Sequence, residues 1–113
     1  MMPKPEEIWL VNFPFTDQTS AKVRPALVIA SYGSDLIILG IFSKVPIGSL
    51  PDSSVLVNSE HPNFLETGLK KTSIVKANKI ATLHESVFQR RLGTIPSDLL
   101  ASVKVSLVKT LNL

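Results

Sequence analysis

The chain has 113 residues, of which 44% are hydrophobic, and this length predicts one globular domain over residues 1–113. It contains no cysteine, which excludes both a disulfide framework and a thiolate metal site. The net charge of +3 is unevenly distributed. Residues 1–67 contain four basic and seven acidic side chains, whereas residues 68–113 contain eight basic and two acidic side chains. A basic second half favours a polyanionic partner such as nucleic acid.

Strands separated by turn-forming segments are expected in the first half of the chain. A stretch after Pro25 reads Ala-Leu-Val-Ile-Ala, which is typical of a strand entering a core. Residues 35–43 are apolar at successive positions, which predicts a central strand with both faces buried. The expected strands are 6–13, 23–30, 35–43 and 53–57, with loops at 14–22 and 44–52.

The second half predicts further strands and then a helix. Residues 72–84 fit a long strand that is bent or broken near residues 77–79, and residues 89–95 fit a short one. From Pro96 onward the apolar residues recur at steps of three and four, which predicts an amphipathic helix capped by Ser97. The expected apolar stripe consists of Leu99, Leu100, Val103, Leu107, Val108 and Leu111.

This order of elements predicts a mainly β fold, a small antiparallel barrel with a C-terminal helix. The longest apolar stretch, LIILGIF, has seven residues and is far too short to span a membrane. The N-terminus has no long apolar segment that would indicate a signal peptide. We therefore expect a cytoplasmic protein with no membrane partner.

Few residue patterns indicate metal or cofactor chemistry. The two histidines, His61 and His84, are far apart and show no metal-ligand spacing. The glycines are scattered singly, so a phosphate-binding loop is not indicated, and a G-x-S-x-G motif is absent. We predict neither a metal ion nor a cofactor.

Cations and hydroxyls gather instead at the expected strand ends. Arg24 begins the second strand, while Ser43 and Lys44 end the third, and antiparallel neighbours place such ends on one rim. Lys76 and Asn78 share one face if their segment is extended. A guanidinium and a hydroxyl on one rim can hold a phosphate, but a solvated strand end explains Arg24 equally well.

The segments EEIWLVNFPFTDQTSAKVRPALVIAS, DLIILGIFSKVP and ETGLKKTSIVKANKIATLHESVFQRRLGTI occur in this order, followed by the predicted helix. This ordered set resembles the MazF/PemK toxins of type II toxin–antitoxin systems over essentially the whole chain. The resemblance implies a barrel of the SH3-like, CcdB/PemK type and a homodimer. It also implies a cognate antitoxin, which binds through a peptide segment.

The resemblance further implies an endoribonuclease that cleaves single-stranded RNA without metal or cofactor. The 2′-hydroxyl of the RNA attacks the adjacent phosphate, so DNA is not cut. The family's catalytic arginine falls on Arg24, and Ser43 is the hydroxyl expected to assist it. The family's catalytic threonine position holds Phe42. Some members have an arginine and an acid where this chain has Lys76 and Asn78. The expected RNA-binding residues are Thr16, Gln18, Lys22, Lys44, Lys76 and Asn78.

Two other functions remain open on the sequence. A catalytically weakened relative would bind RNA or an antitoxin without efficient cleavage, because Phe42 has no hydroxyl and Asn78 cannot transfer a proton as a carboxylate does. A barrel of similar fold could instead act through a protein partner, as the CcdB toxins act on gyrase. The sequence offers no positive sign of that third function.

Overall fold

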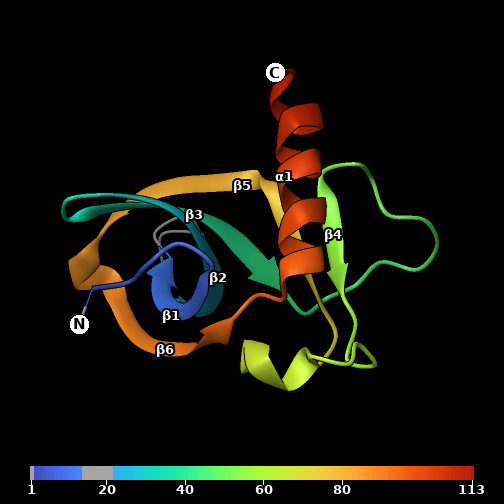
Figure 1. Ribbon diagram of the computed structural model, residues 1–113, viewed down its shortest axis with the longest axis horizontal. Helices are drawn as coiled ribbons and strands as arrows, with labels where there is room; N and C mark the ends of the chain where they lie inside the picture. The colour runs from blue at the N-terminus through green and yellow to red at the C-terminus, as the bar shows by residue number, and fades with distance from the viewer. Residues whose placement is uncertain (1, 14–21) are drawn as a thin grey trace.

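The computed structural model describes residues 2–13 and 22–113, which form a six-stranded antiparallel sheet with a helix at its C-terminal end (Figure 1). Two short 3-10 turns, η1 and η2, precede β5 and β6. The elements are β1 (Glu7–Phe13), β2 (Lys22–Tyr32), β3 (Asp35–Phe42), β4 (Ser54–Val57), η1 (Phe64–Thr67), β5 (Ser73–His84), η2 (Glu85–Val87), β6 (Phe88–Thr94) and α1 (Ser97–Leu111).

The sheet has the order β4-β5-β3-β2-β1-β6, so the apolar strand β3 lies at its centre, as its sequence predicts. In the described residues the edge strands β4 and β6 do not pair with each other, and the barrel is therefore not strictly closed. The mainly β fold with a C-terminal helix is confirmed. In this fold β2 and β5 flank β3 on its two sides.

The expected break in the long fifth strand is also present. Leu39 of β3 pairs with Ile80, whereas the next residue, Gly40, pairs with Lys76. Residues 77–79 are therefore extra residues on β5 without partners on β3, an irregularity that bends a strand. The bend separates the first residues of β5, up to Lys76, from the rest of the strand, and these residues pair with the end of β3.

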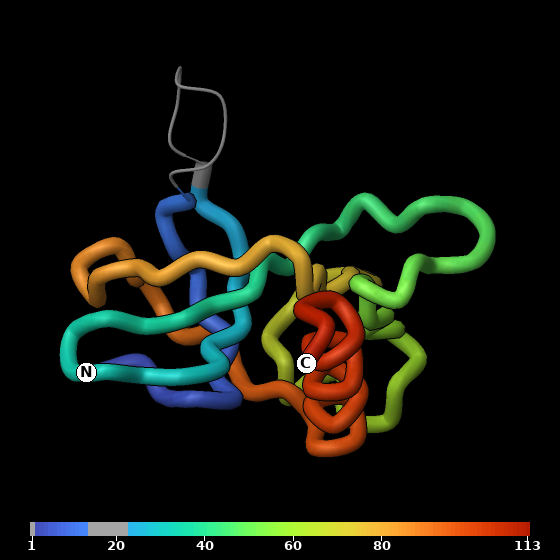
Figure 2. The backbone as a smooth tube through the Cα atoms, turned by 90° about the horizontal axis from the view of Figure 1, so that it is seen from above, coloured from blue at the N-terminus to red at the C-terminus, as the bar shows by residue number. Residues whose placement is uncertain are grey.

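Two hydrophobic cores lie on the two faces of the curved sheet, because successive side chains of a strand point to opposite faces. On β1, for example, Ile8 belongs to the core that α1 covers, and Trp9 belongs to the other core. On β2, Leu27 faces the first core while Ala26 and Val28 face the second. Figure 2 shows α1 end-on, beside the curled strands.

The helix packs against β4 and β5, but its apolar stripe is only partly buried. Val103 is fully buried, and Leu99, Leu100 and Leu107 pack around it. Val108 and Leu111 are each 48% exposed, so the expected stripe is wrong at these two positions. The physical reason is visible in Figure 1, where the last turns of α1 extend beyond the sheet.

The expected helix cap is also wrong. Pro96, in an extended conformation, occupies the N-cap position, and its side chain makes no capping hydrogen bond. Ser97 is already the first helical residue, so its hydroxyl does not serve as the N-cap. Within the part of the chain that the structure describes, no helix is both long enough and apolar enough to cross a membrane.

Candidate functional site

Three neighbouring strands bring Arg24, Phe42 and Lys76 together. The guanidinium carbon Cζ of Arg24, on β2, lies 5.4 Å from the centre of the Phe42 ring at the end of β3. The ammonium nitrogen Nζ of Lys76, on β5, lies 4.6 Å from the same centre. Both cations are within the range of attraction to the ring's π electrons. We call these three residues the cation–ring cluster.

Gly40 makes room for the ring. A Cβ atom at this position would lie 2.8 Å from Cε1 and 3.0 Å from Cζ of Phe42, closer than side chains approach one another. It would also lie 3.5 Å from Cζ of Phe13. The ring of Phe42 therefore packs onto the bare backbone of its own strand, two residues before it.

The charge of the cluster is not neutralised by a carboxylate within the described residues. Their side-chain ion pairs are Arg91 with Glu7 and His61 with Asp98, and neither includes Arg24 or Lys76. The Nε atom of Arg24 is buried and has no hydrogen-bond partner there. A buried donor left without a partner costs about 1–3 kcal/mol, so an anionic acceptor would be bound favourably.

Ser43 directly follows Phe42, the last residue of β3. It is exposed and borders a pocket of about 550 Å³ that Arg24 also borders. The expected rim is therefore present, with Arg24 and Ser43 at one end of adjacent strands. The guanidinium of Arg24 lies against the ring of Phe42.

The pocket is lined by apolar, basic and hydroxyl-bearing residues. No Asp or Glu is found among the described residues that line it. Three of its cations are not among the site residues predicted from the sequence, and the only signal for them is the charge of +6 in residues 68–113. Besides Arg24 and Ser43, the polar lining residues are Lys70, Lys71, Ser73 and Arg90, and the apolar ones include Leu10, Ile41, Leu69 and Leu92.

Close backbone packing places the two lysines beside β6. Gly68 has a φ of 71°, a conformation that favours glycine, and a Cβ there would collide with the carbonyl of Leu92. A Cβ at Gly93 would likewise collide with the carbonyl of Glu66. The segment before Lys70 therefore lies directly on β6 and brings this cationic loop to the pocket.

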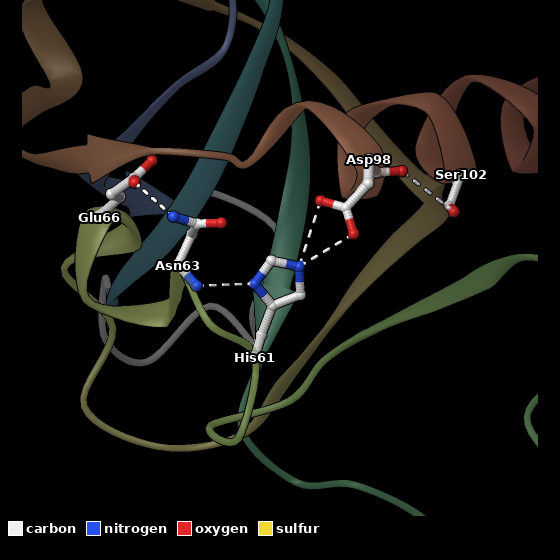
Figure 3. A network of polar contacts seen from close by, with 5 residues as sticks. All are labelled: His61, Asn63, Glu66, Asp98 and Ser102. Atoms are coloured by element: carbon white, nitrogen blue, oxygen red, sulfur yellow. Dashed lines mark hydrogen bonds and ion pairs between the residues drawn. The ribbon is translucent and has the colours of Figure 1, made fainter.

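A polar network ties the same segment to the start of α1 (Figure 3). His61 Nε2 lies 2.9 Å from Oδ2 and 3.1 Å from Oδ1 of Asp98. The backbone N–H of Asn63 donates to His61 Nδ1, and the Asn63 amide donates to Glu66. The hydrogen bond from His61 is the main cause that lowers the pKa of Asp98. The network therefore joins the segment to α1 at His61.

The remaining predicted site residues are Lys44, Asn78, Lys22, Thr16 and Gln18. Lys44 is exposed after the end of β3, and Asn78 is exposed in the irregular part of β5, and neither lines the pocket. Lys22 begins β2. Thr16 and Gln18 lie outside the described residues.

A second cluster of charges lies on β1 and β6 and is fully paired. Arg91 Nε is 3.1 Å from Oε2 of Glu7, whose other oxygen accepts from Trp9 Nε1 and from the backbone N–H of Lys4. Burial alone would raise the pKa of Glu7, but these hydrogen bonds and the charge of Arg91 outweigh it, so its pKa is lowered. We call these residues the Glu7 cluster.

The histidines take structural positions in the described residues. His84 accepts a hydrogen bond from the backbone N–H of Ser86 and so caps η2. No three His, Asp or Glu side chains of the described ranges lie close enough together to hold a metal ion.

A family model described as "PemK-like, MazF-like toxin of type II toxin-antitoxin system" matches residues 4–111. The chain belongs to this toxin family. The curated proteins include no match to this MazF-like toxin. Its fold is that of solved MazF structures, which share its six-stranded sheet and C-terminal helix.

Three solved structures illustrate the similarity of this MazF-like toxin to known ones. MazF from Deinococcus radiodurans is 21% identical with a TM-score of 0.74, covering 100% of this chain and 99% of that one. Mycobacterium tuberculosis toxin MazF-mt6 is 15% identical, with a TM-score of 0.74 and coverage of 95% and 97%. An endoribonuclease in complex with its cognate antitoxin, from mycobacterial species, is 15% identical, with a TM-score of 0.75 and coverage of 98% and 96%.

Proposed function

We propose that this toxin is an endoribonuclease that cleaves single-stranded RNA without a metal ion. Family membership supports the proposal, as does the description of a structurally similar protein as an endoribonuclease. The observation that carries it is the cation–ring cluster, in which Arg24 has a buried Nε without a partner and Lys76 lies beside the same ring. Two cations without a carboxylate are suited to a phosphate.

The proposed reaction uses a nucleophile that the substrate already carries. The 2′-hydroxyl oxygen of the RNA attacks the adjacent phosphorus, and the bond from phosphorus to the 5′-oxygen of the next nucleotide breaks. The hydroxyl proton is released, and the departing 5′-oxygen gains one. The products are a 2′,3′-cyclic phosphate and a 5′-hydroxyl. In this reaction Arg24 stabilises the negative charge that develops on the phosphorane.

Other residues have supporting roles in this proposal. Lys76 binds a phosphate oxygen as a second charge, and Ser43 offers one neutral hydrogen bond from the pocket side. Lys44 and Asn78, both exposed, would contact RNA beyond the cleaved phosphate. Lys22, Thr16 and Gln18 are proposed RNA contacts on sequence grounds. Binding to RNA should weaken as salt rises, because these cations displace counterions from phosphates.

The test is a digest of single-stranded RNA by the wild-type protein and by Arg24→Ala, in buffer with EDTA. We expect the wild type to leave 2′,3′-cyclic phosphate ends and the variant to be much slower. A DNA strand of the same sequence should stay intact, since it lacks the 2′-hydroxyl. Cleavage of the DNA strand, or loss of all activity in EDTA, would contradict the proposal.

A second candidate function is favoured by the ring at position 42. The resemblance places a catalytic threonine there, whereas the phenyl ring of Phe42 has no hydroxyl and is in contact with two cations. A protein of this kind would bind RNA without efficient cleavage. The same digest separates the two functions when it is paired with a binding measurement, since the second candidate binds but leaves the strand intact.

We further propose that the toxin is a cytoplasmic homodimer that an antitoxin neutralises. Val105, Val108 and Leu111 on α1 are exposed and apolar, which supports a protein contact there. The antitoxin would be an acidic and hydrophobic segment that folds over the basic pocket and blocks Arg24. A sedimentation mass near 12.3 kDa, that of one chain, would contradict the dimer.

A further inference from the structure

Phe42 lies on β3, and each of the two strands that flank β3, β2 and β5, carries a cation near it. Arg24 comes from β2 and Lys76 from β5, and both lie over the ring. We propose that Phe42 is a positioning residue that holds these two cations together as one phosphate-binding pair. This inference rests on the proposed function and states how its site is built.

The position of the ring is set by its own strand. Gly40 has no Cβ, and the ring edge occupies the place where one would be. Phe42 is half-buried, and Phe13 of the neighbouring core also approaches Gly40. The ring is therefore held by β3 itself and does not depend on the cations to stay in place.

The positions of the cations, by contrast, depend on the ring. Neither Arg24 nor Lys76 has an ion-pair partner in the described ranges, so no carboxylate holds either of them there. Their distances of 5.4 Å and 4.6 Å from one ring centre place the two charges within about 10 Å of each other, although like charges repel. The attraction of each cation to the ring's π electrons opposes that repulsion.

A neutral ring has an advantage over a carboxylate in this place. A carboxylate would accept hydrogen bonds from the guanidinium, as Glu7 does from Arg91, and would cancel its charge. The phenyl ring attracts a cation without accepting its N–H groups in ordinary hydrogen bonds. The Nε–H of Arg24 and the ammonium of Lys76 therefore stay available for an anion.

The experiment weakens the ring's π electrons with little change of shape. Phe42 is replaced by 4-fluorophenylalanine and by 3,4,5-trifluorophenylalanine, and binding of oligo(dT), which cannot be cleaved, is measured by fluorescence anisotropy. We expect the dissociation constant to rise stepwise with fluorine number, by about tenfold for the trifluoro side chain. The Nε–Hε NMR signal of Arg24 should also move in steps, without nucleic acid present.

The matched control is the same replacement at Phe88. Its ring packs edge-on against Trp9, 6.2 Å away between centres, where the described structure places no cation over it. We expect fluorination at position 88 to change the affinity for oligo(dT) less than twofold. A similar loss at both positions would show a general effect on the fold and overturn the inference.

A second variant, Gly40→Ala, keeps the phenyl ring but displaces it from its place on β3. It should weaken oligo(dT) binding as trifluorination does, and thermal melts report whether the sheet is intact. Unchanged affinity in folded trifluoro-Phe42 protein, with affinity lost in Arg24→Ala, would overturn the role of Phe42 and leave the proposed function standing. If the wild type binds oligo(dT) through Arg24 and Phe42 but cuts no RNA, the proposed function is overturned and the role of Phe42 stands. No binding of oligo(dT) by the wild type would overturn the phosphate-binding pair itself.

Discussion

Two arginines of this small protein lie in opposite electrostatic surroundings. Arg91 Nε is 3.1 Å from Oε2 of Glu7, whose Oε1 accepts from Trp9 Nε1 and from the backbone N–H of Lys4. Arg24 lies over a phenyl ring, beside a second cation, and its Nε is buried without a partner. In the first arrangement the arginine is paired with a carboxylate of the same chain, which stabilises the fold. In the second arrangement the positive charge is left unpaired and can bind an anionic ligand.

The largest expected effect is on catalysis at Arg24. Arg24→Ala should lower the RNA cleavage rate by two to three orders of magnitude, about 3–4 kcal/mol of transition-state stabilisation. Arg24→Lys should recover little of it, since an ammonium cannot hold two phosphate oxygens as a guanidinium does. The measurement is the single-turnover rate of folded variants. Arg91→Ala is the control and should change this rate less than threefold, and full activity in Arg24→Ala would exclude the proposed mechanism.

The next effect is on stability at the Glu7 cluster. Glu7→Gln removes a charge that a guanidinium, an indole N–H and a backbone N–H all contact, and it should cost about 1–2 kcal/mol in the free energy of unfolding. Urea melts at pH 7 measure this cost. Glu60→Gln, at an exposed carboxylate, is the control.

The same variant should change the pH dependence of stability. Because the pKa of Glu7 is lowered in the folded state, its contribution to stability is complete above the ordinary pKa of a glutamate and is lost as the pH falls through the lower folded pKa. The stability of the wild type should therefore fall more steeply in acid than that of Glu7→Gln. Parallel acid profiles for the two proteins would contradict this account.

A smaller effect is expected at Ser43. Ser43→Ala removes one neutral hydrogen bond from an exposed residue, so cleavage should slow by about 1 kcal/mol, or roughly fivefold. Ser49→Ala, in the exposed loop that follows, is the matched control and should leave the rate unchanged. A loss at Ser43 as large as that at Arg24 would mean that the hydroxyl acts directly on the reacting atoms.

The smallest effect is expected at the His61–Asp98 pair. Asp98 is exposed and its pKa is lowered by the hydrogen bond from His61, so its contribution to stability is lost as the pH falls below the ordinary carboxyl range. Asp98→Asn should lower the melting temperature slightly at pH 7 and flatten this acid dependence. Asp52→Asn serves as the control. An unchanged melting curve for Asp98→Asn at every pH would show that the pair does not hold the segment.

The sequence by itself determined the elements, the family and the position of Arg24. Periodicity predicted the strands, the central place of β3 and the bend at residues 77–79, because these depend on local patterns of apolar side chains. It overestimated the apolar stripe of the helix at Val108 and Leu111, because a local pattern does not show where the sheet ends. The proposed roles of the site residues remain predictions.

Only the tertiary structure decided what surrounds each charge. The sequence gives no sign that Phe42 meets Arg24 and Lys76, because 34 positions separate Phe42 from Lys76 and only the pairing of β3 with β5 closes that distance. It likewise gives no sign that Lys70 and Arg90 border one pocket, which depends on the close contact of two glycines with the backbone. The sequence shows which residues are charged. Which residue each of them contacts is set by strand order and register, which arise from packing of the whole chain.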